Sequence, residues 1–108
     1  MMNKSTGIRM SKVYISGKIT GLDLEYAKSL FDEAQMYLQN EYGCTIVNPM
    51  VAVPYKEGKT WEQYMLDDIN LLFGCDAVFM LKNWEDSRGA RVECSIAKEM
   101  SKTILFQD

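Results

Sequence analysis

Histidine is absent from this chain of 108 residues. Its absence excludes Ser-His-Asp and Cys-His catalysis, histidine general bases and histidine metal ligands. An enzyme built from this chain therefore has to use carboxylates, hydroxyls or lysines for its chemistry. Cysteine is scarce too: Cys44, Cys75 and Cys94 are the only ones, and they form no C-x-x-C pair. This pattern disfavours a disulfide framework and a zinc site, so we expect reduced thiols, no metal and no cofactor.

A surplus of positive charge is also missing, since 12 Lys and Arg face 15 Asp and Glu. We therefore expect no nucleic acid polymer as a partner. No apolar run approaches the ~18 residues of a membrane span, so no membrane partner is expected either. Residues 1–11 are polar and lack the apolar core of a signal peptide. We expect a cytoplasmic protein with a flexible tail over residues 1–11 and a single domain over residues 12–108.

Strand-like and helix-like segments alternate along the domain. Short β-branched, aromatic or apolar runs predict four strands, at residues 12–16, 44–47, 77–81 and 103–106. Apolar residues spaced by three and four predict three helices, at residues 23–41, 60–73 and 90–100. We expect an α/β three-layer sandwich with a mainly parallel four- to five-stranded sheet, Rossmann-like or flavodoxin-like. Ligands of such folds bind beyond the carboxyl ends of the strands, which singles out the predicted loops at 17–21, 48–59 and 83–89.

The first of these loops follows Ser16 and reads Gly17-Lys18-Ile-Thr-Gly21. Its glycines allow backbone amides to turn toward an anion, and the lysine adds a positive charge. The segment matches neither a Walker loop nor G-x-G-x-x-G, and an ordinary strand-to-helix turn explains it equally well.

Carboxylates supply the next candidates. Asp67 and Asp68 are adjacent on the predicted second helix, so their side chains point about 100° apart and only one of them can face the cleft. The alternative without a functional role is that both carboxylates lie on a helix face exposed to water. Asp76 precedes a buried strand, and we expect it to cap or orient a loop.

The third segment joins a polar loop to the start of the last predicted helix. Ser87, Arg88 and the amides near Gly89 are suited to bind an anion at a helix N-terminus, with Glu93 close to the same cleft. Alternatively, Glu93 only balances the helix dipole, which is worth a few tenths of a kcal/mol. Two carboxylates without histidine suit glycosyl chemistry, in which one attacks or shields an anomeric carbon and the other moves protons.

Three motifs together resemble the nucleoside 2-deoxyribosyltransferase-like superfamily, in particular a branch of small bacterial and phage members. They are Val-Tyr-Ile-Ser-Gly-Lys-Ile-Thr-Gly at 13–21, Asp-Ile-Asn-Leu-Leu-Phe-Gly-Cys-Asp at 68–76, and Trp-Glu-Asp-Ser-Arg-Gly-Ala-Arg-Val-Glu at 84–93. The resemblance extends over residues 12–106 and implies dimers or higher homo-oligomers.

The resemblance also implies roles for single residues. Glu93 matches the glutamate that attacks C1′ of a deoxyriboside, and Asp68 matches an aspartate that assists at the base or sugar. Tyr14 matches a tyrosine that positions this glutamate or the sugar. Ser87 matches a serine that contacts the 5′-phosphate of monophosphate substrates. Ser16 and Gly17 match positions that line the same pocket.

The implied reaction is cleavage or transfer of the N-glycosidic bond of a (deoxy)nucleoside or nucleoside 5′-monophosphate, with retention at C1′. Ser87, Arg88 and the amides near Gly89 favour a monophosphate substrate. The alternative is a nucleotide-binding module without turnover, because Arg88 and Arg91 replace apolar or glycine residues of the characterised enzymes. A third possibility is an interaction protein whose partner surface contains Trp61, Tyr64 and Trp84, although aromatic residues more often belong to a core or a pocket wall.

Overall fold

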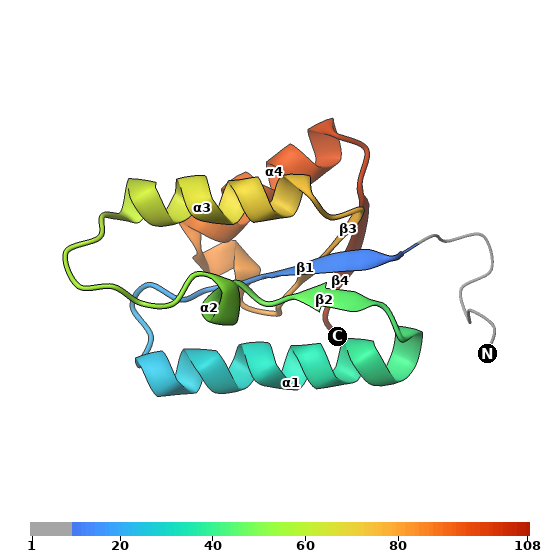
Figure 1. Ribbon diagram of the computed structural model, residues 1–108, viewed down its shortest axis with the longest axis horizontal. Coiled ribbons are helices and arrows are strands. Elements are labelled where there is room, and N and C mark those ends of the chain that lie inside the picture. Colours follow the sequence, from blue (N-terminus) through green and yellow to red (C-terminus); the bar gives the residue numbers. More distant parts are fainter. Residues whose placement is uncertain (1–9) are drawn as a thin grey trace.

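The computed structural model describes residues 10–108 of the chain. Within this range four strands alternate with four helices and one short 3-10 turn (Figure 1). The elements are β1 (Lys12–Ser16), α1 (Leu24–Tyr42), β2 (Thr45–Val47), α2 (Pro49–Ala52), α3 (Trp61–Phe73), β3 (Ala77–Met80), the 3-10 turn (Trp84–Asp86), α4 (Arg88–Glu99) and β4 (Thr103–Phe106).

The strands of the described chain form one sheet with the order β2-β1-β3-β4, and every neighbouring pair is parallel. This is a flavodoxin-like arrangement, and it confirms the predicted α/β class with four strands. Because β1 lies centrally, the chain leaves it toward β2 on one side and returns to β3 on the other. The carboxyl ends of β1 and β3 therefore flank the topological switch point, where folds of this kind bind ligands.

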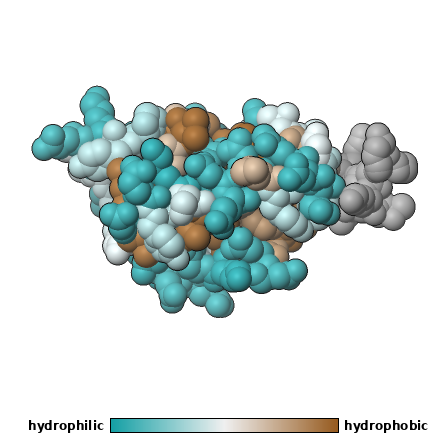
Figure 2. Space-filling view, turned by 90° about the horizontal axis from the view of Figure 1, so that it is seen from below, coloured by the Kyte–Doolittle hydropathy of each residue, from teal (hydrophilic) through white to brown (hydrophobic). Residues whose placement is uncertain are grey.

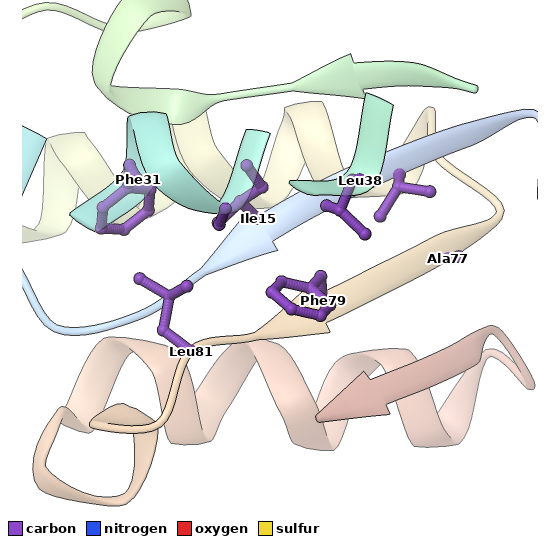
Figure 3. Packing of buried hydrophobic residues seen from close by; sticks show 8 residues of the cluster. Ile15, Phe31, Leu38, Ala77, Phe79 and Leu81 are labelled. Atoms are coloured by element: carbon purple, nitrogen blue, oxygen red, sulfur yellow. The ribbon is translucent and has the colours of Figure 1, made fainter. Parts of the chain in front are cut away.

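Helices cover both faces of the sheet, with α1 on one side and α3 and α4 on the other (Figure 1). Successive side chains of β1 point to opposite faces of the sheet. Val13 and Ile15 pack with α1, whereas Tyr14 packs in the cluster that contains residues of α3 and α4. Figure 3 shows the cluster on the α1 side, where Phe31 of the helix lies near the strand residues. The outer face on this side is largely hydrophilic, with scattered hydrophobic residues (Figure 2). Because side chains alternate along a strand, Ser16, two residues after Tyr14, points to the same side as Tyr14, toward the layer of α3 and α4.

Local sequence signals set the helix ends. The side chain of Asp23 accepts a hydrogen bond from the Tyr26 amide and caps α1, and Gly43 ends this helix with a φ of 63°. Thr60 and Gln63 form a capping box at the start of α3.

Two predicted loops contain more regular structure than expected. The segment expected to be irregular after residue 49 begins with helix α2, because the Asn48 side chain accepts from the Met50 amide and Pro49 suits the first turn. The expected loop at 83–89 contains the 3-10 turn, and α4 starts two residues earlier than predicted because Ser87 caps it through the Ala90 amide.

The predicted tail at 1–11 lies outside the described residues except for its last two. Met10 packs against the core, and the backbone N–H and hydroxyl of Ser11 donate hydrogen bonds to the Asp76 carboxylate. Asp76 also accepts from the Lys12 amide, so it orients the entry to β1 as expected. The cysteines are free thiols. In residues 10–108 no helix is long and apolar enough to span a membrane.

Candidate active site

Glu93 is a buried carboxyl group that two hydroxyl groups hold in place. Its side chain is only 4% exposed, because α4 turns Ala90, Glu93, Cys94 and Ala97 toward the sheet. The Tyr14 hydroxyl donates to Oε2 at 2.9 Å, and the Ser16 hydroxyl donates to Oε1 at 2.6 Å. The strand period of two places both donors on the face that α4 covers. A glutamate that only balances a helix dipole would remain solvated. The burial of Glu93 and its two hydroxyl partners therefore disfavour a role limited to the helix dipole.

Burial dominates the electrostatics of this group. It raises the pKa of Glu93 from 4.5 to about 7, although the hydrogen bonds from Ser16 and Tyr14 lower it. The pKa of Tyr14 lies well above 10, first because the phenol is buried and then because Glu93 is nearby. Tyr14 is therefore a neutral hydroxyl throughout the physiological range, available as a hydrogen-bond donor to the carboxylate.

Asp68 is the second carboxyl group of the site, and it comes from α3. It is partly buried, whereas its neighbour Asp67 is exposed and pairs with Lys59. The prediction that only one of the two faces the cleft is therefore confirmed. Burial raises the pKa of Asp68 to about 7, the charges of Glu93 and Asp67 add to this, and the charge of Lys59 lowers it.

Both carboxyl groups line one cavity of about 570 Å³, a size typical of small-molecule sites. Its walls come from the end of β1, the β1–α1 loop, α2, the α2–α3 loop, α3 and the start of α4. The expected site residues that line it are Tyr14, Ser16, Gly17, Asp68, Ser87, Gly89 and Glu93.

Two residues expected to bind substrate do not contribute to this wall. The backbone N–H of Lys18 donates to Asn83 Oδ1 at 2.9 Å, but its side chain does not line the cavity. The Arg88 guanidinium lies 3.9 Å from the centre of the Trp61 ring. Arg91 donates to the Glu85 carbonyl oxygen at 2.6 Å. The two arginines that motivated a binding module therefore place no charge on the cavity wall.

Close packing explains the glycines at the edge of the cavity. A Cβ atom on Gly17 would lie 2.6 Å from Leu81 Cδ1, so any other residue here would force this buried leucine to move from the end of β1. A Cβ atom on Gly89 would lie 2.9 Å from Met65 Sδ, where the start of α4 approaches α3. In the first turn of α4, the amides of Arg88 and Gly89 have no acceptor within the helix, so they are available to an anion.

The sequence interpretation missed much of the cavity wall. Besides Lys59, the wall includes three aromatic side chains that were not assigned to a binding site: Tyr55, Trp61 and Tyr64. Helical spacing could have identified two of them, since Trp61 and Tyr64 precede Asp68 by seven and four residues and so share its face of α3. Both were instead considered for a partner surface. In the described part of the chain, no group of three or more Cys, Asp or Glu side chains could hold a metal ion.

Comparisons with known proteins agree with this fold. One solved structure, a 2-deoxyribosyltransferase from the psychrotolerant bacterium Bacillus psychrosaccharolyticus, is similar with a TM-score of 0.66 and 20% sequence identity. The match covers 88% of this chain and 70% of that chain, and it confirms at the level of the fold the resemblance that the motifs predicted. A search of curated proteins found no match. A family model described as a domain of unknown function, DUF4406, matches residues 11–106, and the chain therefore belongs to this family.

Proposed function

We propose that this protein cleaves or transfers the N-glycosidic bond of a (deoxy)nucleoside or nucleoside 5′-monophosphate, with Glu93 as the nucleophile. The observation that carries the proposal is the buried Glu93 carboxyl group, which accepts hydrogen bonds from Tyr14 and Ser16 and shares a cavity with Asp68. The similarity to a 2-deoxyribosyltransferase fold supports the same reaction class.

The two carboxyl groups have different environments, which suits two roles. Glu93 is buried and Asp68 is partly buried, loss of solvent raises the pKa of each to about 7, and the charge of Glu93 further disfavours ionisation of Asp68. Such a pair holds one proton between them at neutral pH. Glu93 has two hydroxyl donors that stabilise its anion, so the proton resides on Asp68. Glu93 is then the carboxylate that attacks, and Asp68 is the acid.

In the first step, a Glu93 oxygen forms a bond to C1′ while the bond between C1′ and the base nitrogen breaks. The departing base takes the proton of Asp68, which leaves Asp68 ionised. In the second step, Asp68 accepts a proton from water or from the nitrogen of a second base, and that nucleophile displaces Glu93 from C1′. Water gives hydrolysis and a second base gives transfer, both with retention.

The start of α4 supports a phosphate on the substrate. Ser87 and Gly89 line the cavity, and the amides at the N-terminus of this helix favour an anion. This arrangement favours a nucleoside 5′-monophosphate over a free nucleoside.

A direct assay uses a panel of nucleosides, deoxynucleosides and their 5′-monophosphates, with released base measured by chromatography. We expect release from at least one of them, and loss of release in Glu93→Ala and Asp68→Asn. Glu99→Ala is the matched control, because this glutamate is exposed on the same helix. Ligand-induced thermal stabilisation without any released base would favour the binding module instead. Undiminished release by Glu93→Ala would exclude the mechanism.

A further inference from the structure

Lys59 lies in the loop between α2 and α3, and the backbone on both sides of it is fixed. Its amide donates to the Lys56 carbonyl oxygen at 3.2 Å, which closes a turn through Gly58 with a φ of 85°. The Tyr64 hydroxyl accepts from the Lys56 amide at 2.7 Å and donates to the Lys56 carbonyl at 3.1 Å. Immediately after Lys59, Thr60 begins α3 with its capping box. The loop is thus tied to the helix that carries Asp68.

The side chain of Lys59 is fixed as well. It is only 17% exposed, and its Nζ atom lies 2.5 Å from Asp67 Oδ2 and 4.6 Å from the centre of the Tyr64 ring. Ordering a lysine costs up to about 2 kcal/mol of side-chain entropy, so a lysine side chain held by two contacts differs from an ordinary surface lysine. Among the described residues that line the cavity, Lys59 is the only cation.

The charges that face Asp68 come from three elements. Burial raises the pKa of Asp68 most, and the charges of Glu93 of α4 and then Asp67 of α3 raise it further. Lys59 of the loop lowers it. Tyr14 of β1 is neutral in this range. Lys59 therefore supplies the positive charge that opposes two negative neighbours and the loss of solvent.

We propose that Lys59 is a positioning residue that acts through Asp68, because the loop holds its ammonium group against Asp67 and on the wall of the cavity that Asp68 also lines, where its positive charge favours the Asp68 carboxylate. The inference rests on the proposed function, since it is that function which assigns the acid role to Asp68. Lys59 itself forms no bond to the reacting atoms in this assignment.

The ion pair of Lys59 with Asp67 allows a specific test of the inference. Its two charges shift the pKa of Asp68 in opposite directions, since Lys59 lowers it and Asp67 raises it. Removing the positive charge with Lys59→Met leaves Asp67 unopposed, so the Asp68 carboxyl should hold its proton to higher pH. Removing the negative charge with Asp67→Asn should have the reverse effect. If the role of the pair were purely structural, both variants would loosen the loop and would shift the pKa of Asp68 in the same direction.

The measurement is a ¹³C NMR titration of the Asp68 side-chain carboxyl group, which requires no catalytic activity. We expect the midpoint to rise by on the order of one pH unit in Lys59→Met and to fall in Asp67→Asn. Lys56→Met is the matched control, because it removes a charge from the same loop at a residue that does not line the cavity. It should leave the midpoint unchanged. Shifts of the same sign in both ion-pair variants, or no shift in Lys59→Met, would overturn the inference.

Activity then provides a second readout. If the base is released by the wild-type protein, the alkaline limb of the pH–rate profile should move to higher pH in Lys59→Met, and Lys59→Arg should restore it. An unmoved limb would overturn the inference. If no tested substrate releases base but the NMR midpoints move in opposite directions, the proposed function fails, whereas the electrostatic relation between Lys59 and Asp68 holds.

Discussion

Replacing Glu93 by Gln is expected to stabilise the protein at alkaline pH. The pKa of Glu93 is 4.5 in its ordinary state and about 7 in the folded protein. The folded state therefore holds the proton more tightly than the unfolded chain, and stability is lost as the pH rises from about 4.5 through about 7. At about 1.4 kcal/mol per pH unit, the buried carboxylate destabilises the fold by about 3 kcal/mol above pH 7.

A glutamine at this position carries no charge, and the hydroxyls of Tyr14 and Ser16 can still bond to it. We expect Glu93→Gln to raise the free energy of unfolding by about 3 kcal/mol at pH 8.5 and by only about 1 kcal/mol at pH 5. Urea unfolding, followed by the fluorescence of Trp61 and Trp84, measures both values. An exposed control, Glu99→Gln, should change little at either pH. A variant that is less stable than the wild type at pH 8.5, or a gain independent of pH, would refute the reasoning.

Three further predictions concern the residues around this group. Gly17→Ala should destabilise the protein by about 1–3 kcal/mol, because the new Cβ meets the side chain of Leu81 at 2.6–2.9 Å. Gly74→Ala should be nearly neutral in the same urea titration, because its Cβ would meet the Leu71 carbonyl oxygen at 3.5 Å, an ordinary contact. Tyr14→Phe removes a hydrogen bond to the proposed nucleophile, so base release should slow about 10- to 100-fold and its acidic limb should move to higher pH; an unchanged profile would argue against the role of this hydroxyl. Asp76→Asn should destabilise the protein at pH 7, and the difference should vanish as the pH falls below 3.8, because hydrogen bonds from the entry to β1 lower the pKa of this carboxyl. A difference that persists at pH 2 would contradict this assignment.

Local patterns were sufficient for most of the fold. The strand at Lys12–Ser16 and the helices predicted at 23–41 and 60–73 depend on neighbours in sequence, and the structure has each of them within one residue of the predicted bounds. Helix α2 was missed because four residues are too few for a helical period to show. The predicted start of α4 is too late because a glycine favours a loop, whereas Gly89 lies in the first turn of a helix that Ser87 caps.

The site was predictable only in part. Glu93, Asp68 and Tyr14 were singled out through motifs, and the structure brings them together in one cavity, while their catalytic roles stay predictions. Arg88 was expected to face substrate because charge near a helix N-terminus suggests an anion site. Its stacking on Trp61, 27 residues away in sequence, is a tertiary contact that no local pattern reveals. Lys59 was not predicted as a site residue, because a lysine in a polar loop has no periodic pattern that indicates where its side chain lies.

The central claim is that the Glu93 carboxylate forms a bond to C1′ of the substrate. Mass spectrometry of acid-quenched protein tests this most directly, after incubation with nucleosides and 5′-monophosphates that carry a 2′-fluorine to destabilise the oxocarbenium-like transition states. We predict a mass increase of one sugar or sugar phosphate on the peptide that contains Glu93, and none in Glu93→Gln. Release of the base by the wild-type protein with the adduct on another residue, or with no adduct under conditions that trap the intermediate of a retaining enzyme, would contradict the account.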